Sequence, residues 1–131
     1  MGGLKRLVCL VMVTATPLAA FNGTADQQLH FFASCAGRLS ATMEHQWNHD
    51  TASADQTKSY RTEMIDLVTA VMPADRGRDV LLMRVEAKHA QARLLRRTVI
   101  NRDPVDADWA LSRAEAMLRE CTSVLMSASA D

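Results

Sequence analysis

Apolar residues recur at steps of three and four along most of this 131-residue chain. That spacing places them on one face of an α-helix. The clearest such stripe comprises Leu29, Phe32, Ala36, Leu39, Met43 and Trp47. The chain has only 5 Gly and 3 Pro, which argues against a turn-rich β-sandwich, and its length suits one domain. The sequence therefore predicts a single all-α domain.

Residues typical of helix ends divide the chain into four predicted helices. Two capping boxes, Thr24-Ala-Asp-Gln and Ser53-Ala-Asp-Gln, are expected to open the first and second helices. Pro73 ends the second helix, and Asp103 caps a fourth helix that has Pro104 at its first position. The expected helices span residues 25–49, 54–72, 77–101 and from 104 onwards.

Short connections between these helices make sequential neighbours antiparallel, so we expect an up-down-up-down four-helix bundle. Ala33, Gly37 and Ser40 are small enough to let a neighbouring backbone approach the first helix closely. The expected core comprises Leu39, Met43, Leu67, Val68, Leu94, Met117 and Val124.

Residues 1–20 have the pattern of a secretory signal peptide. Lys5 and Arg6 precede the apolar run 7–13, and Pro17 comes before the small residues at 19–20. The apolar run is shorter than the roughly 20 residues of a spanning helix, although an uncleaved anchor is the alternative. We expect cleavage after Ala20, with Ala25 as the alternative, and a periplasmic or secreted mature protein without a membrane span.

The mature chain, residues 21–131, is expected to form the single helical domain and keeps two cysteines, Cys35 and Cys121. In an oxidising compartment two such cysteines usually pair, the alternative being two buried thiols. Cys35 lies in the first half of the first helix and Cys121 near the end of the last, so an antiparallel bundle places both at similar height. We therefore predict a disulfide that joins the first and last helices.

The third helix is unusually basic. Segment 76–102 holds eight basic and two acidic residues, a charge of +6. The 15 basic residues of the chain include Lys5 and Arg6, so the mature chain has 13 against 15 acidic residues, a charge of −2. A zero charge for the whole chain offers no general attraction to nucleic acid.

Three polar residues of the third helix, Arg84, Lys88 and Gln91, project between two apolar stripes. The stripes are Val80–Met83–Ala87–Ala90–Leu94 and Leu81–Val85–Ala92–Leu95–Val99. An apolar arc this wide predicts neighbours on both sides of the helix. We expect a structural polar seam in which Arg84 and Lys88 pair with carboxylates, with Glu44, Glu63 and Asp66 as candidates. An anion or partner site is the alternative.

Arg93, Arg96 and Arg97 share the outer face of the third helix, and Trp109 lies opposite the buried stripe of the fourth. Arginine and tryptophan concentrate binding energy at protein interfaces. These four residues are therefore the candidate partner-binding surface, and packing of Trp109 against a loop is the alternative.

His45 and His49 are four residues apart, a spacing that places two imidazoles on one helical face for a metal ion. A favourable interaction of exposed histidines with a helix C-terminus is the alternative. The sequence shows no Ser-His-Asp arrangement, paired carboxylates, Gly-rich phosphate loop or nucleotide fingerprint.

These patterns predict an exported, non-enzymatic binding or accessory protein that acts through its helical surface. It needs no cofactor and binds no nucleic acid, and its expected partner is an acidic periplasmic or envelope protein. The alternative is a small periplasmic metal-binding or metal-sensing protein that uses His45 and His49, with an enzyme as the third possibility. No pattern in the sequence sets an oligomeric state.

Overall fold

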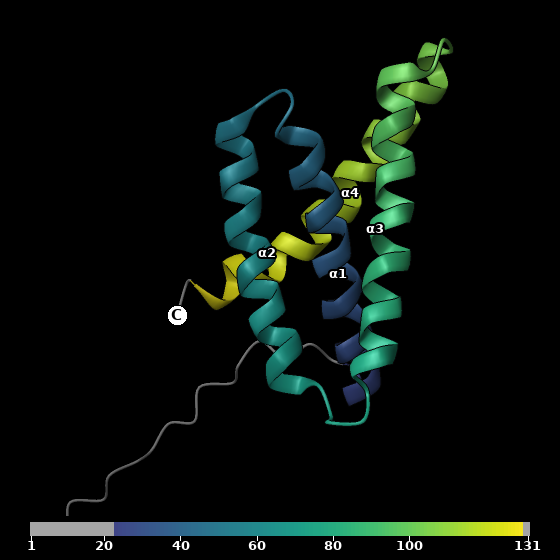
Figure 1. The fold of residues 1–131 in the computed structure, drawn as a ribbon. Coiled ribbons are helices and arrows are strands. Elements are labelled where there is room, and N and C mark those ends of the chain that lie inside the picture. The colour runs from purple at the N-terminus through teal and green to yellow at the C-terminus, as the bar shows by residue number, and fades with distance from the viewer. Residues whose placement is uncertain (1–22, 130–131) are drawn as a thin grey trace, which may run out of the picture.

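A computed structural model of the protein describes residues 23–129 and contains four α-helices and no strand in that range. The helices are α1 (Ala25–Gln46), α2 (Thr51–Val71), α3 (Gly77–Ile100) and α4 (Pro104–Ala128). They alternate in direction, which confirms the predicted all-α, up-down-up-down bundle (Figure 1). The predicted signal peptide lies outside the described residues. No helix within them is both long enough and apolar enough to cross a membrane.

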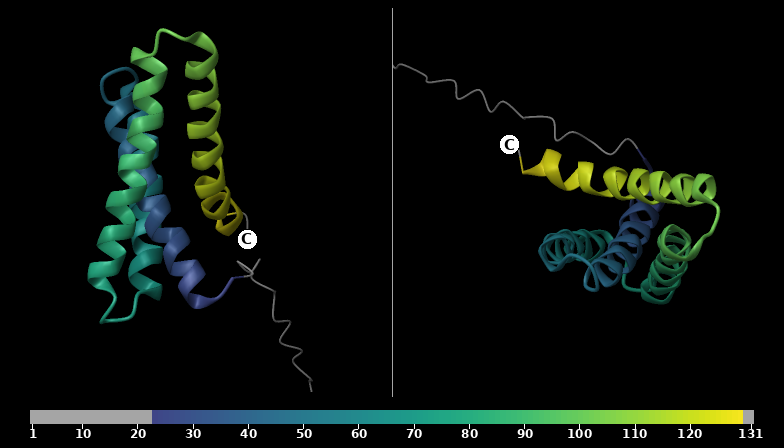
Figure 2. Two further views of the ribbon diagram at one scale, coloured as in Figure 1. Left: turned by 90° about the vertical axis from the view of Figure 1, so that its right-hand side faces the viewer. Right: turned by 90° about the horizontal axis from the view of Figure 1, so that it is seen from above.

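Helix α1 is the centre of the fold. It packs against all three other helices, whereas within residues 23–129 the backbones of α2 and α3 do not come close to each other. Helix α4 begins beside the end of α3 and runs obliquely behind α1 towards α2 (Figures 1 and 2). Consequently every residue from Phe32 to Gly37 and from Leu39 to Met43 is buried.

The predicted core is confirmed at its centre and looser at its margin. Leu39, Met43 and Val68 are buried. The other four predicted core residues are only partly buried. They are Leu67, Leu94, Met117 and Val124.

The Thr24 capping box is confirmed, because Thr24 Oγ1 accepts from Gln27 N at 3.2 Å while Thr24 N donates to Gln27 Oε1 at 2.8 Å. The Ser53 box is wrong. Asp50 caps α2 instead, and its carboxylate accepts from both the backbone N and the Oγ of Ser53 at 3.1 and 2.5 Å. This cap starts α2 at Thr51, so α1 ends at Gln46, earlier than expected.

The predicted disulfide is present. Cys35 and Cys121 are joined with an S–S distance of 2.05 Å and a Cα–Cα distance of 5.5 Å. Both residues are completely buried. The bond therefore ties the middle of α1 to the last third of α4 across 86 residues of sequence.

Helices α1 and α3 meet backbone to backbone at Gly37. A Cβ placed on Gly37 would lie 2.1 Å from the carbonyl O of Arg84 and 3.0 Å from the backbone N of Lys88. Any side chain at this position would force the two helices apart, since the atoms it meets are backbone atoms. Gly37 therefore sets the distance between α1 and α3, as its small size predicts.

We predict that Gly37→Ala destabilises the protein by about 1–3 kcal/mol, as overpacking of a tight contact does. In an open helix interior the same substitution would stabilise by about 0.5–1 kcal/mol. Gly77→Ala is the matched control, because nothing lies within 4 Å of a Cβ at Gly77. Urea unfolding of both variants measures the difference, and a Gly37→Ala variant at least as stable as wild type would contradict the close contact.

Candidate binding surface

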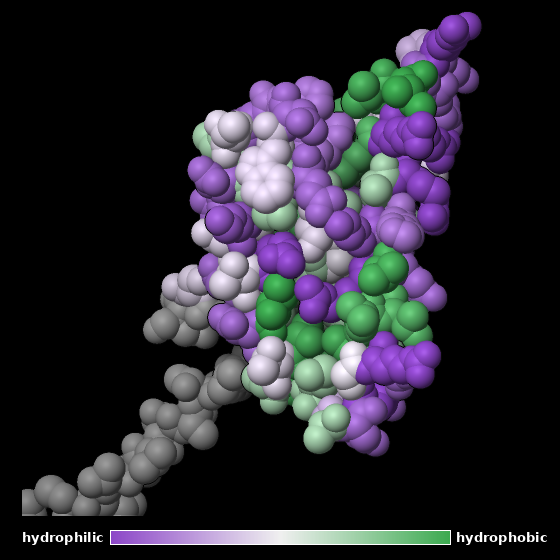
Figure 3. Space-filling view, in the orientation of Figure 1, coloured by the Kyte–Doolittle hydropathy of each residue, from purple (hydrophilic) through white to green (hydrophobic). Residues whose placement is uncertain are grey.

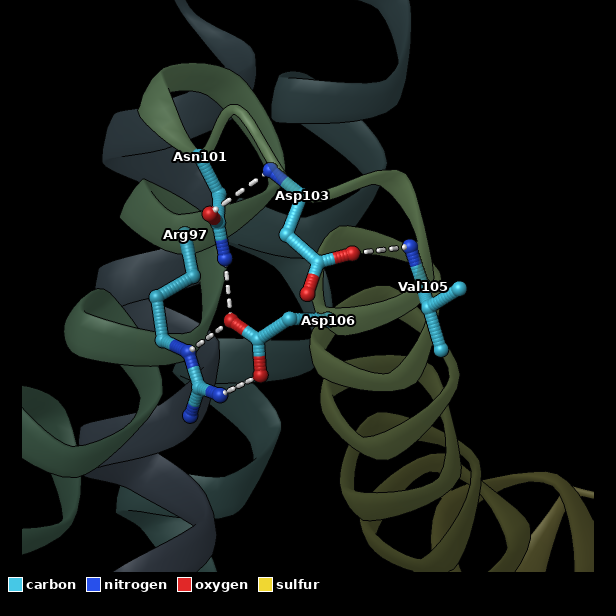
Figure 4. A network of polar contacts seen from close by, with 5 residues as sticks. All are labelled: Arg97, Asn101, Asp103, Val105 and Asp106. Carbon is cyan, nitrogen blue, oxygen red and sulfur yellow. Dashed lines mark hydrogen bonds and ion pairs between the residues drawn. The ribbon is translucent and has the colours of Figure 1, made fainter.

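The turn between α3 and α4 is held by a network of polar contacts centred on Asp106, in the first turn of α4 (Figure 4). Arg97 donates from Nε to Asp106 Oδ2 at 3.1 Å and from Nη2 to Oδ1, and Asn101 donates from Nδ2 to Oδ2. Asp103 accepts from Val105 N at 3.0 Å and so caps α4 as predicted. The end of α3 is thereby clamped to the start of α4.

Trp109 lies one turn further along α4, and the guanidinium of Arg97 stacks over its ring at 5.0 Å from the centroid. The indole is nevertheless 55% exposed. A cation over an aromatic face contributes about 0.5–1 kcal/mol at an exposed site. Arg97 is therefore held between Asp106 and Trp109, and Trp109 remains an accessible aromatic side chain in contact with it.

The other two arginines of the predicted surface are free. Arg93 and Arg96 are exposed, and neither forms an ion pair with any described residue. Arg93 precedes Arg97 by one helical turn. The structure thus brings Arg97 and Trp109 into contact and places Arg93 and Arg96 on the adjoining surface of α3.

A groove of about 880 Å³ lies between α1, from its start to Arg38, and the middle of α4, from Arg113 to Glu120. Arg38 and Arg113 line it from opposite helices, together with Glu120. Partial burial lowers the pKa of Arg38, while the charge of Glu120 raises it and that of Arg113 lowers it. Arg113 follows Trp109 by one turn of α4, so basic residues continue from the α3–α4 corner into this groove.

Sequence reasoning missed Arg38 and Arg113, because they belong to different helices and meet only where α4 crosses α1. The disulfide was the available signal. It links Cys35, close to Arg38 in sequence, with Cys121, next to Glu120, and so identifies the segments that face each other.

The predicted polar seam is formed in part. Lys88 Nζ pairs with Glu44 Oε1 at 2.6 Å near the surface. Gln91 is buried and donates from Nε2 to Thr42 Oγ1 at 3.3 Å and to the carbonyl O of Ala114 at 3.1 Å. This amide therefore links α3 to both α1 and α4.

Arg84 differs from the expectation, since it is only partly buried and pairs with no carboxylate among residues 23–129. The reason lies in the packing. Glu44 is paired with Lys88, while the candidates Glu63 and Asp66 lie on α2, whose backbone stays away from that of α3.

His45 and His49 lie together but do not share a helix, because α1 ends at Gln46 and His49 lies in the turn that follows. Their rings stack at 5.0 Å between centroids, and His49 Nδ1 is 3.0 Å from the carbonyl O of His45. The neighbouring Asp50 carboxylate is bonded to Ser53. The described part of the chain contains no group of three His, Cys, Asp or Glu residues placed to hold a metal ion.

Burial lowers the pKa of His45 below its usual 6.5, and the charge of His49 lowers it further. The unfolded chain therefore binds a proton more readily than the folded one. We predict that stability is highest above pH 6.5 and falls as the pH decreases through 6.5 towards the lower pKa of the folded state. Melting temperatures at pH 7.5 and 5.5 test this prediction. The wild type should melt at a higher temperature at pH 7.5, and His45→Gln should reduce the difference between the two melting temperatures. The control variant is His30→Gln, at an exposed position of α1. Its difference in melting temperature between the two pH values should stay larger than that of His45→Gln.

Comparison with known family models, with characterised proteins and with solved structures finds no match to this chain.

Proposed function

We propose that the protein is exported, loses residues 1–20 and acts as a non-enzymatic binding or accessory protein for an acidic protein of the periplasm or cell envelope. The signal-peptide pattern supports export. The Cys35–Cys121 disulfide is consistent with an oxidising compartment.

The Thr24 cap favours the first of the two cleavage positions. Cleavage after Ala20 leaves Thr24 in place to cap α1 through its bonds with Gln27. Cleavage after Ala25 would remove this cap. Loss of an N-cap costs about 0.5–2 kcal/mol of stability, so maturation after Ala20 preserves the folded domain.

The contact of Arg97 with Trp109 is the observation that carries the binding proposal. Asp106 and Asn101 fix this pair before any partner arrives, so little conformational freedom is lost on binding. Arg93 and Arg96 add free positive charge next to it. A surface of this kind attracts an acidic partner electrostatically and offers it an aromatic anchor.

The alternative metal-binding function has weaker support. The two imidazoles are stacked, and Asp50, the nearest carboxylate in sequence, caps α2. A metal site built on His45 and His49 would need ligands from outside the described residues.

Affinity capture of the full chain from a periplasmic extract tests the proposal. We expect Arg93→Glu combined with Arg96→Glu to reduce recovery of the partner at least tenfold, and Trp109→Ala to weaken binding as well. Arg97 is left unchanged, because its substitution would also break the α3–α4 clamp.

Lys58→Glu combined with Arg119→Glu is the matched control. It makes the same change in charge at exposed positions of α2 and α4 outside the proposed surface. Unchanged melting temperatures establish that both double variants are folded. Equal recovery with the two double variants would contradict the proposed binding surface, and a stoichiometric Zn²⁺ or Cu²⁺ site lost in His45→Ala would favour the alternative.

A further inference from the structure

Helix α3 has a hydrophobic face that no other part of the described chain covers. We name Leu81, Val85, Ala92 and Val99 the outer stripe. Leu81, Val85 and Val99 are 57, 40 and 60% exposed. Leu82 and Ile100, each one residue further along α3, are also exposed, at 55 and 62%. Figure 3 shows two hydrophobic areas along α3, one towards each end of the helix, separated by more polar residues.

The topology explains why the outer stripe is uncovered. Helix α3 packs on α1 and α4, and α2 does not reach it. The first apolar stripe of α3 faces these neighbours, so that Val80 is buried and Met83 and Leu94 are partly buried. Of the second predicted stripe, only Leu95 is buried. The expected neighbour on the second side of α3 is therefore missing within residues 23–129.

The spacing of this face is that of a helix–helix seam. Leu81, Val85, Lys88, Ala92, Leu95 and Val99 follow one another at intervals of four, three, four, three and four residues. This heptad-like spacing is typical of a surface that receives a second helix. Within the bundle, Leu95 is already buried and Lys88 pairs with Glu44 of α1, so Leu81, Val85, Ala92 and Val99 are the positions of this series that stay exposed. Helices that lie on membranes usually bring Trp or Phe to their apolar face, and α3 has no aromatic residue.

Basic residues border the outer stripe on both edges. Arg84 follows Leu81 by three residues, on the edge towards α1. Arg78, His89 and Arg96 lie three or four residues from stripe residues on the other edge. The two acidic residues of α3 are Asp79, which is paired with Arg76, and Glu86. The borders of the stripe are therefore predominantly positive.

We propose that the outer stripe binds an acidic amphipathic helix of the partner protein. The apolar face of that helix would pack on Leu81, Val85 and Val99, while its flanking carboxylates would face Arg78, Arg84 and Arg96. A second copy of this chain fits less well, because the basic borders of two paired α3 helices would face and repel each other. The inference rests on the proposed binding function and specifies the chemistry of the partner. From Leu81 to Val99 the stripe is about 27 Å long, which corresponds to a partner helix of about 18 residues.

Site-specific photocrosslinking in cells that make the protein tests this inference. The full chain would carry p-benzoylphenylalanine at Val85 or at Val99, and as a control at Met126, an exposed apolar residue of α4. Mass spectrometry of the digested adducts identifies the crosslinked segment. We expect Val85 and Val99 to crosslink to one segment with apolar residues at steps of three and four and an excess of Asp and Glu. Leu81→Asp should reduce the Val99 adduct at least tenfold without loss of helical circular dichroism.

Several results would overturn the inference. They are an adduct with a second copy of the chain, an adduct with lipid, a segment without excess acidic residues, and a yield at Val85 and Val99 no higher than at Met126. If one of these occurs while Arg93→Glu with Arg96→Glu still releases the captured partner, the outer stripe is not the docking site but the proposed function stands. If Arg93→Glu with Arg96→Glu also fails to release the captured partner, the proposed function fails together with this inference.

Discussion

The burial of α1 by three other helices is the constraint on which the other features depend, and each neighbour is held by a different contact. Helix α3 approaches so closely that only a glycine fits at Gly37. Helix α4 is joined through the Cys35–Cys121 disulfide. Helix α2 is connected by hydrogen bonds, from Thr57 Oγ1 to Gln46 Oε1 and from Arg61 Nε to Ser40 Oγ, both at 2.7 Å. Because α1 occupies the centre, α2 and α3 lie on different sides of it and remain apart.

This separation determines which surfaces are free to bind. A helix in a symmetric bundle packs against two sequential neighbours, but α3 uses one side only, for α1 and α4. Its other side keeps exposed leucine and valine residues between basic borders. At the end of α3, Arg97 is drawn towards α4 by Asp106 and positions Trp109. The same packing that buries α1 thus leaves two surfaces accessible, the outer stripe of α3 and the Arg97–Trp109 pair at the α3–α4 corner.

Much of the fold follows from the sequence, because its signals are local. The Thr24 box and the Asp103–Pro104 start of α4 each depend on a few adjacent residues, and both are confirmed. The prediction of Ser53 as the cap of α2 is wrong, and Asp50 is the cap; both residue types favour this position. Only the structure shows that Ser53 donates to Asp50. The disulfide could be predicted because removal of the expected signal peptide leaves two cysteines, Cys35 and Cys121, and therefore a single pairing.

Features that depend on the packing of helices could not be predicted. Arg84 lacks the expected carboxylate because α2 and α3 are separated, and helical periodicity contains no information about that distance. Arg38 and Arg113 meet in a groove because α4 crosses α1 obliquely. The apolar arc of α3 predicted neighbours on both sides, but within the described chain only one side is covered.

The most direct test of the central role of α1 is hydrogen exchange of the Cys35→Ala, Cys121→Ala variant. Ala114 is buried near the middle of α4, and Cys121 and Leu125 are buried in its second half. In the chain-entropy account, a bond closing this loop contributes about 4.5 kcal/mol. We therefore predict that protection falls in the variant more for amides after Ala114 than for those of α1 and of α3 around Gly37 and Lys88, which exchange only when the whole domain unfolds. An equal fall in α1, α3 and α4, or unchanged protection in α4, would contradict this account.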